Sequence, residues 1–358
     1  MGCSFRWFCL AWGLFSVVPT SGYGQLHIAD RATCPSCRIV VTSMGASFSD
    51  DGGEHTPGVV RHRGRFIVPT RKGAPEVFDL SGRHLSSLAR SGAGPGEFGG
   101  NTVLAVGPGD SVAAYDPPNG RIQIFDPSLK FARGFRVGQP VLPGGLLWLS
   151  DGRFVLGGPL QTPEGIGYTI HVFDAGGVYR KSIGESRRPI GPRSSAYQGF
   201  RLLCALPNRQ IVSVTVVGEY RLQVWDLETG RLEHDWIRDS PVFDHVEGPL
   251  GSRIVAMATD SAGRAWVMMS VLAPDWRKGV SEEVIGGVEH TFRIIDREGV
   301  LDTAVDVIDL EKGELFAADR FSRLLRGFIE GPGLATAWIP GSVQGTDLVA
   351  VSLRTNQR

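Results

Sequence analysis

A short cysteine pair is the first feature of the sequence that could do chemistry. Cys34 and Cys37 form a Cys-x-x-Cys motif, which can form a disulfide, act as a redox pair or supply half of a zinc site. A thioredoxin-like redox pair needs a strand–helix–strand context, which the surrounding sequence does not predict. A zinc site needs a second ligand pair, and none lies nearby. We therefore expect a disulfide between Cys34 and Cys37, and a buried thiol at Cys204.

Other signatures of catalysis are missing from the sequence, and we assign no catalytic residue. The eight histidines are scattered and form neither His-Glu-x-x-His nor His-x-His. The sequence has no Gly-x-Ser-x-Gly elbow and no Gly-x-x-x-x-Gly-Lys-[Ser/Thr] phosphate loop. The glycine-rich run at residues 92–96 leads toward another strand and not toward a helix whose N-terminus could bind phosphate. We interpret this run as a connection between strands.

The charge balance argues against a polyanionic partner. Lys and Arg together number 37, Asp and Glu together number 37, and the formal net charge is +0. A balanced chain has no long-range field that would attract nucleic acid or an anionic membrane. No basic patch is interleaved with aromatic residues either. We therefore expect no nucleic-acid partner.

The elements that would position a site are indicated by a repeat that ends in aspartate. Alternating apolar residues are followed by Asp and a turn at five positions: Asp79, Asp126, Asp174, Asp226 and Asp309. The first four lie about 50 residues apart, which is the length of a four-stranded propeller blade. A carboxylate at a strand end accepts hydrogen bonds from backbone N–H groups of the turn. We interpret these aspartates as structural and not as catalytic carboxylates.

A second unit precedes these repeats and consists of two apolar runs joined by a polar turn. Examples lie at residues 104–112, 147–155 and 257–267. A turn such as Asp151-Gly152 between alternating apolar runs is a strong hairpin signal. Glycine, at 48 of 358 residues, is about twice as frequent as in an average protein and supplies the positive φ angles of tight turns. The sequence thus predicts strand after strand, grouped in fours.

The two ends of the chain complete the predicted ring. The aspartate turns indicate five blades, and the C-terminal tail adds strands near residues 324–329, 334–339 and 347–353. A fourth strand for this blade is available at residues 38–42, and pairing the two ends would remove the open edges of the ring. We predict an all-β six-bladed β-propeller with four antiparallel strands per blade and an N-terminal strand closing the last blade. Five or seven blades remain alternatives.

The fifth repeat is ambiguous, because the gap between Asp226 and Asp309 is about 30 residues longer than a blade. Asp296 lies inside this gap and follows the same apolar pattern. We favour Asp309 for the fifth blade, because its turn is nearly a copy of the turn after Asp226. The extra residues, about 271–300, would then form an insertion, and a loop of this length in a compact domain is often functional.

The order of residues 90–126 resembles the NHL type of repeat. A glycine-rich turn ending in Phe98 and an inner strand at 103–106 are followed by the pattern D-x-x-N-x-R-I-x-x-F at residues 116–125. The likeness is good over residues 59–137 and weaker beyond. The chain also resembles bacterial exported six-bladed propellers that carry such repeats. This resemblance implies the fold but little about activity, because NHL-type propellers include ligand-binding scaffolds and a few enzymes.

The N-terminal segment is typical of a secretory signal. Arg6 precedes an apolar run at residues 7–18, and small or turn-forming residues follow up to Gly24. The run is too short to span a bilayer comfortably, although an uncleaved anchor is an alternative. We expect cleavage near Gly24 or Gln25, export to the periplasm or the medium, and no transmembrane segment in the mature chain. The predicted organisation is a signal peptide at 1–24, an N-terminal segment with the cysteine pair at 25–37 and one propeller domain at 38–358.

Two functions fit this architecture. The first is a non-catalytic scaffold that binds a protein or a small-molecule ligand on a rim of the propeller. The second is a metal-dependent hydrolase or lyase, with calcium at the channel mouth, as in the lactonase-like and amidating-lyase-like propellers that the architecture resembles. The expected innermost strands carry mainly apolar and small residues, so we favour the scaffold. The candidate contact residues are Trp276 and Arg277 in the insertion and Arg326 near the channel.

Overall fold

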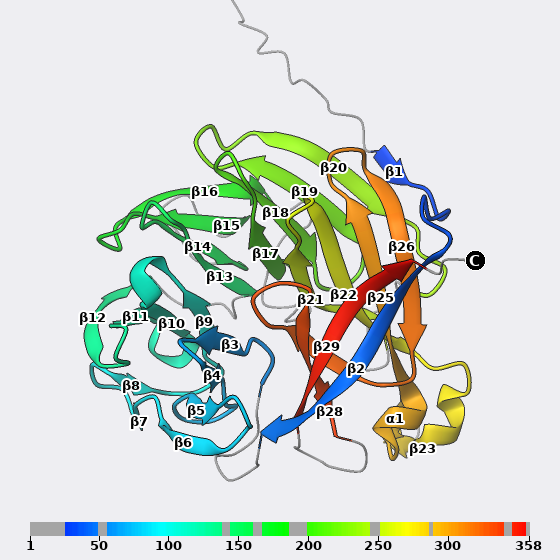
Figure 1. The fold of residues 1–358 in the computed structure, drawn as a ribbon, viewed down its shortest axis with the longest axis horizontal. Coiled ribbons are helices and arrows are strands. Elements are labelled where there is room, and N and C mark those ends of the chain that lie inside the picture. Colours follow the sequence, from blue (N-terminus) through cyan, green and yellow to red (C-terminus); the bar gives the residue numbers. More distant parts are fainter. Residues whose placement is uncertain are drawn as a thin grey trace, which may run out of the picture.

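The structure is a computed structural model that describes residues 26–48, 56–137, 144–159, 167–185, 199–243, 251–285, 289–339 and 346–355. In these ranges the chain forms six sheets of four antiparallel strands, arranged as blades around a common centre (Figure 1). The predicted six-bladed β-propeller is confirmed, and the alternatives of five or seven blades are excluded. The predicted signal peptide at 1–24 lies outside the described residues.

Within each of the first three blades, the strands follow the chain from the innermost to the outermost position. Blade 1 contains β3 (Val60–His62), β4 (Arg65–Val68), β5 (Glu76–Asp79) and β6 (His84–Ser87). Blade 2 contains β9 (Val103–Val106), β10 (Val112–Asp116), β11 (Arg121–Phe125) and β12 (Phe131–Arg136). Blade 3 contains β13 (Gly145–Trp148), β14 (Phe154–Gly157), β15 (Tyr168–Phe173) and β16 (Tyr179–Glu185).

The other three blades keep this order, with one insertion and one strand from the N-terminus. Blade 4 contains β17 (Arg201–Ala205), β18 (Gln210–Thr215), β19 (Arg221–Asp226) and β20 (Leu232–Arg238). Blade 5 contains β21 (Arg253–Thr259), β22 (Arg264–Leu272), β25 (Leu301–Asp309) and β26 (Glu314–Phe321). Blade 6 contains β27 (Leu325–Phe328), β28 (Leu334–Trp338), β29 (Thr346–Thr355) and β2 (Cys37–Phe48).

An N-terminal strand and the C-terminal strand meet in blade 6, as predicted. Strand β2 pairs in antiparallel register with β29, from Cys37 opposite Thr355 to Phe48 opposite Thr346. In Figure 1 these strands, blue and red, lie side by side. Strand β2 extends beyond the predicted residues 38–42, and it buries Ile39 and Phe48 in the core. The ring is therefore closed by pairing β2, from the N-terminal part of the chain, with β29, from the C-terminal part.

The core lies in layers between neighbouring blades. Strand β10 is buried along its whole length, because its alternate side chains point to opposite faces of the sheet. Val112 and Ala114 pack in the cluster that includes Ile67 of blade 1, whereas Ala113 and Tyr115 pack in the cluster that includes Phe154 of blade 3. A sheet sandwiched in this way needs apolar residues at successive positions, which explains the continuous apolar runs of the sequence.

The repeated aspartates cap the turns that follow the third strands. The Oδ1 atom of Asp126 accepts hydrogen bonds from the backbone N–H groups of Ser128 (2.8 Å) and Lys130 (3.0 Å). The same atom of Asp309 accepts bonds from Glu311 (3.0 Å) and Lys312 (3.1 Å). The structural interpretation of these carboxylates is confirmed at both positions.

Asp309 belongs to blade 5, as we favoured. It ends β25, which pairs with β22 on one side and with β26 on the other. Asp296 lies outside the blade, between the last strand of the insertion and the short helix α1 (Arg297–Val300). The insertion occupies residues 273–300, because β22 ends at Leu272 and β25 begins at Leu301.

A strap of residues 26–36 runs around the outer edges of blades 4 and 5 before the chain enters β2. Its first residues form β1 (Leu26–Ile28), which pairs in parallel with the outer strand β20. The N–H groups of Thr33 and Cys34 then donate to the carbonyls of Leu315 and Phe316 in β26 (2.8 and 2.9 Å). With β2 in blade 6, the N-terminal residues cover the edges of three consecutive blades (Figure 1).

The propeller has two faces with different connections. We call the face at which the innermost strands begin the loop face. It carries the connections between blades and the connections between the second and third strands of each blade, because successive strands are antiparallel. The opposite turn face carries the shorter turns. Within the described ranges, none of the helices has the length and apolar character that crossing a membrane requires.

Candidate functional site

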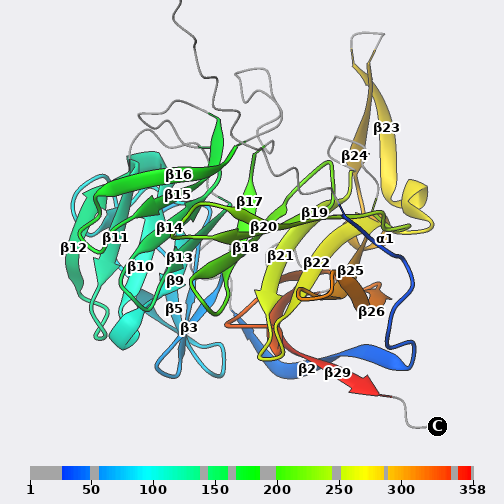
Figure 2. The same cartoon turned by 90° about the horizontal axis from the view of Figure 1, so that it is seen from above.

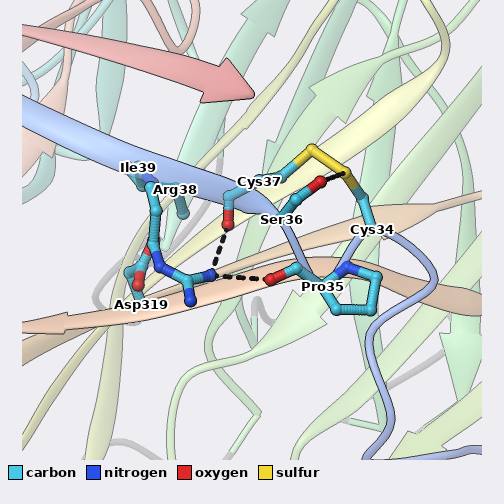
Figure 3. The surroundings of a disulfide bond; sticks show 7 residues. All are labelled: Cys34, Pro35, Ser36, Cys37, Arg38, Ile39 and Asp319. Carbon is cyan, nitrogen blue, oxygen red and sulfur yellow. Dashed lines mark hydrogen bonds between the residues drawn. A yellow bond between two sulfur atoms is a disulfide. The ribbon is translucent and has the colours of Figure 1, made fainter. Parts of the chain in front are cut away.

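The predicted cysteine pair lies where the strap enters β2. The structure joins Cys34 and Cys37 in a disulfide, with Cα atoms 5.3 Å apart (Figure 3). The Arg38 guanidinium donates to the carbonyls of Pro35 (3.0 Å) and Cys37 (2.8 Å). The Ile39 N–H group donates to the carboxylate of Asp319 in blade 5. Together with these hydrogen bonds, the disulfide fixes the turn between the strap and the closing strand β2. We call it the disulfide clasp.

The insertion of blade 5 forms a hairpin on the loop face. It consists of β23 (Val280–Ile285) and β24 (Glu289–Ile294), and Figure 2 shows the hairpin extending away from the body of the propeller. At its base the Ala273 N–H group donates to the carbonyl of Val300 (2.8 Å), and Val300 is fully buried. The two ends of the insertion are therefore held together next to the β22–β25 pair.

Trp276 and Arg277 lie together at the base of this hairpin. Both belong to a short 3-10 turn, η4 (Trp276–Gly279), and the Arg277 guanidinium carbon lies 4.7 Å from the centre of the Trp276 ring. Arg277 is exposed and Trp276 is partly buried. A Cβ atom at Gly279 would come within 2.8 Å of the carbonyl oxygen of Asp296, so the turn packs closely against the returning chain. The pair thus lies at the base of the hairpin, where the Arg277 side chain is exposed to solvent.

Arg326 lies in a different blade from this pair and is turned into the protein. It belongs to β27, the innermost strand of blade 6, and it is 6% exposed. Its guanidinium carbon lies 3.9 Å above the ring of Trp338, and its Nη1 donates to the hydroxyl of Thr346 (2.6 Å). These contacts fix Arg326 against the second and third strands of its own blade.

The polar residues of the D-x-x-N-x-R pattern all support the glycine-rich connection on the loop face. Arg121 donates to the carbonyls of Ala93 (2.9 Å), Gly94 (2.6 Å) and Glu97 (2.8 Å). Asp116 accepts bonds from the Gly99 N–H group (3.1 Å) and from the Asn119 side chain (2.7 Å). These side chains hold the connection between blades 1 and 2 in place.

A cluster that sequence reasoning missed joins Glu76, His84 and Ser87 on the outer strands of blade 1. The His84 Nε2 atom lies 2.6 Å from Glu76 Oε2, and the Ser87 hydroxyl donates to Glu76 Oε1 (3.0 Å). In a Ser-His-acid triad the imidazole stands between the hydroxyl and the carboxylate. Here the carboxylate stands in the middle, so no imidazole is placed to take the proton of Ser87. The cluster ties β5 to β6.

Buried ion pairs stabilise the faces of blade 4. Arg221 binds Asp235 through two hydrogen bonds, of which the Nε–Oδ1 bond is 2.6 Å long, and both side chains are buried. Arg238 donates from Nε to Asp306 of blade 5 (3.0 Å) and from its second terminal nitrogen to Asp30 of the strap (2.8 Å). Burial raises the pKa of Asp306, although Arg238 opposes this shift.

Arginines stand near the start of three successive innermost strands, another feature that sequence reasoning missed. Arg201 begins β17, Arg253 begins β21 and Arg326 is the second residue of β27. Arg201 differs from the paired arginines described above. Its Nη1 donates to the carbonyl of Phe200 (2.9 Å), and its buried Nε has no hydrogen-bond partner in the described ranges. An alignment of the repeats at their innermost strands would have shown these three arginines at equivalent positions.

Metal ligands are scattered in the part of the chain that the structure describes. No group of three or more His, Cys, Asp or Glu side chains there has the geometry to hold a metal ion. The innermost strands carry mainly apolar side chains, as expected, for example Leu104 and Leu146. The candidate binding features of the loop face are therefore the projecting β23–β24 hairpin and the three arginines near the start of β17, β21 and β27.

Comparison with solved structures shows the same fold at low sequence identity. A candidate exported protein from Bacteroides fragilis has a TM-score of 0.56 at 10% identity, with 93% of this chain and 99% of that chain covered. A member of the DUF4221 family from Bacteroides vulgatus has a TM-score of 0.51 at 10% identity, with 88% and 99% covered. A gluconolactonase from Xanthomonas campestris has a TM-score of 0.50 at 13% identity, with 92% and 99% covered. Neither a family model nor a curated protein sequence matches this chain.

Proposed function

We propose that this chain is an exported binding scaffold whose protein partner docks on the loop face around the β23–β24 hairpin. One observation carries the proposal: a hairpin inserted in a regular blade projects from the loop face, and the two ends of the insertion are bonded to each other where they leave β22 and enter β25 (Figure 2). A blade needs only four strands, so the hairpin adds nothing to ring closure. Functional residues are found disproportionately on loops that a rigid scaffold positions.

Removal of the hairpin tests this proposal. We expect a variant in which residues 280–294 are replaced by a short Gly-Ser linker to keep a far-UV spectrum typical of strands and a Tm within about 3 °C of wild type, because the blade itself stays intact. Chemical cross-linking in cells, followed by purification, should recover a partner with the full chain and lose it with the variant. A partner set that is identical for both chains would refute a role of the hairpin.

Export is the second part of the proposal. Its support is the signal-like composition of residues 1–24 and the fold that this chain shares with a candidate exported protein from Bacteroides fragilis. The experiment is fractionation of expressing cells combined with N-terminal sequencing. We expect a mature chain that begins near Gln25, in the periplasm or in the medium. An intact chain in the cytoplasm would overturn this part without affecting the hairpin test.

We also propose that the repeats are of the NHL type. The support is local: the residues of the pattern at 116–125 bind the glycine-rich connection that the pattern includes, through Arg121, Asp116 and Asn119. Replacing Arg121 with Met removes three hydrogen bonds to carbonyls, and we expect faster hydrogen exchange in residues 90–98 than in wild type. Unchanged exchange there would show that the pattern does not organise this connection.

The alternative function is a metal-dependent hydrolase or lyase with calcium at the channel mouth. The observation in its favour is the shared fold with the Xanthomonas campestris gluconolactonase. Purified protein can be assayed for bound calcium and for hydrolysis of sugar lactones. Turnover that is lost on chelation and restored by calcium would favour this alternative over the scaffold.

A further inference from the structure

The start of β17 holds a cation that no carboxylate of the described residues contacts. The only hydrogen bond of the Arg201 guanidinium there is made by Nη1 to the carbonyl of Phe200, its neighbour in the chain. The Nε atom is buried and has no partner within the described ranges. Glu219 is near enough to favour the positive charge, but it already pairs with Arg221 (3.6 Å). Among the described residues, Arg201 is therefore a positive group without a counter-ion of its own.

This arrangement is costly for the folded protein. Loss of solvation lowers the pKa of Arg201 to about 10, and the positive charge of Arg221 adds to the effect. The buried arginines Arg221 and Arg238 of the same blade do have carboxylate partners, Asp235 and Asp306. Arg201 is half-buried, and a guanidinium that is taken partly out of water without such a partner destabilises the fold. Proteins tolerate local costs of this kind where a binding site requires them.

The position of Arg201 is suited to a ligand. Strand β17 packs between β13 and β21 in the inner ring of strands around the channel. Arg253 begins the next innermost strand, and the adjacent Ile254 N–H group donates to the Val216 carbonyl of blade 4 (2.8 Å). This bond holds the start of β21 against blade 4. Arg201 and Arg253 therefore stand at the loop-face ends of neighbouring innermost strands.

We propose that Arg201 anchors an anion-binding site at the loop-face mouth of the channel, for a ligand that presents a carboxylate or phosphate group. A guanidinium donates parallel hydrogen bonds to two oxygens of such a group, which would satisfy the buried Nε. The site lies on the inner ring and does not require the hairpin, so the inference goes beyond the proposed function and can fail independently of it.

The first measurement uses anions as probes of the wild-type protein. Thermal unfolding is followed in sodium phosphate, in sodium acetate and in sodium chloride at equal ionic strength and pH. We expect phosphate or acetate to raise the Tm by about 2 °C above the chloride value when the anion exceeds its dissociation constant tenfold. Equal Tm values in all three salts would overturn the proposal.

The second measurement uses matched arginine variants. We expect Arg201→Met to raise the Tm in chloride, because the uncompensated charge is gone, and to abolish the shift caused by phosphate or acetate. Arg221→Met should lower the Tm, because it removes the arginine that binds the buried Asp235 carboxylate. Arg133→Met, on the exposed outer strand of blade 2, should keep the anion shift. If Arg201→Met lowers the Tm, fails to fold or retains the anion shift, Arg201 is a structural residue and the proposal is wrong.

The source of the oxyanion is resolved by the hairpin variant. A free small acid should still shift the Tm of the variant that lacks residues 280–294, because Arg201 is unchanged in it. An acidic side chain of a protein partner would instead require the partner itself. In that case phosphate should compete with the cross-linked partner of the full chain and reduce its recovery. If phosphate leaves the recovery of the cross-linked partner unchanged, Arg201 does not bind an acidic side chain of that partner.

Discussion

The carboxylates at the strand ends are held in their ionised form by the turns that they cap. Backbone N–H groups and a Ser81 hydroxyl donate to Asp79, and these bonds lower its pKa to about 2. The pKa of Asp126 is lowered for the same reason, with the Ser128 hydroxyl as the largest contribution. Each carboxylate therefore favours the folded state only while it is ionised.

These pKa values predict a loss of stability in acid. The folded-state pKa of Asp79 lies below the unfolded value of about 3.9, so its contribution is complete above about pH 5 and is lost as the pH falls toward 2. We expect the free energy of unfolding, measured with urea, to fall over this range. Asp126→Asn should be less stable than wild type at pH 7 and should approach it at pH 2. An equal difference at both pH values would contradict this account.

The Arg221–Asp235 pair predicts a strongly non-additive double-mutant cycle. Arg221→Met removes the arginine that binds the buried Asp235 carboxylate, and we expect it to cost about 3–5 kcal/mol of unfolding free energy. Adding Asp235→Leu should recover most of this loss, because both charges are then removed from the interior. Chemical denaturation of the four proteins gives the coupling energy. Additive single losses would show that the two side chains do not act as a pair.

Single residues were predictable where their role is local. The cap at Asp126 follows from residues within four positions of it, so the strand–Asp–turn pattern was enough to assign it. The cluster of Glu76, His84 and Ser87 depends on how β5 and β6 align across their bulge, and no local pattern in the sequence specifies that register. That no carboxylate of the described residues contacts Arg201 likewise depends on how the inner strands pack.

At the scale of elements, the blade strands were predictable and the strap was not. Strands such as β10 and β11 carry apolar residues in runs bounded by turn residues, which is a strong signal. Strand β1 has three residues and no periodicity, and its parallel pairing with β20 joins segments that are distant in the sequence. A strand this short, held only by pairing with a sheet edge that is distant in the sequence, has too few residues to show an alternation of apolar and polar side chains.

The disulfide clasp predicts a local effect on the strap. Closing the short Cys34–Cys37 loop stabilises by about 2 kcal/mol in the loop-entropy model. In Cys34→Ser we expect exchange of the two backbone amides that hold the strap to β26, those of residues 33 and 34, to accelerate about tenfold to thirtyfold. Amides of β10 in blade 2 should be unaffected. Reductant should reproduce the effect in wild type and leave the variant unchanged, and a uniform acceleration over all blades would contradict the local account.

At the scale of the whole molecule, ring closure was predictable because it is a matter of counting. The tail offered three strands and the N-terminal region one, and four strands make a blade. The position of the hairpin on the loop face then follows from its place between a second and a third strand. The nature of the docking partner does not follow from the count, because the propeller repeat specifies stacking and leaves the loops free to vary.

Loss of the closing strand predicts self-association. Deleting residues 26–48 removes Ile39 and Phe48 from the core and exposes the edge of β29. We expect a fall in Tm of about 5 °C or more and oligomers detected by light scattering, because an open edge pairs with other chains. Deleting only residues 26–30 keeps β2 and the covered edge of β29, and this control should form fewer oligomers than the longer deletion. A monomer of unchanged Tm after the longer deletion would refute closure as the source of stability.

The pairing of β2 with β29 also determines when blade 6 can form during synthesis of the chain. Strand β2 leaves the ribosome early, yet its partner β29 follows roughly 300 residues later, a delay of about 15–60 s at usual rates of translation. During this interval a strand with an apolar face has no edge to pair with, and it must be kept from aggregating. Holdase chaperones that cover β2 should therefore govern the yield of native protein, and ribosomes stalled before and after residue 346 would measure that dependence.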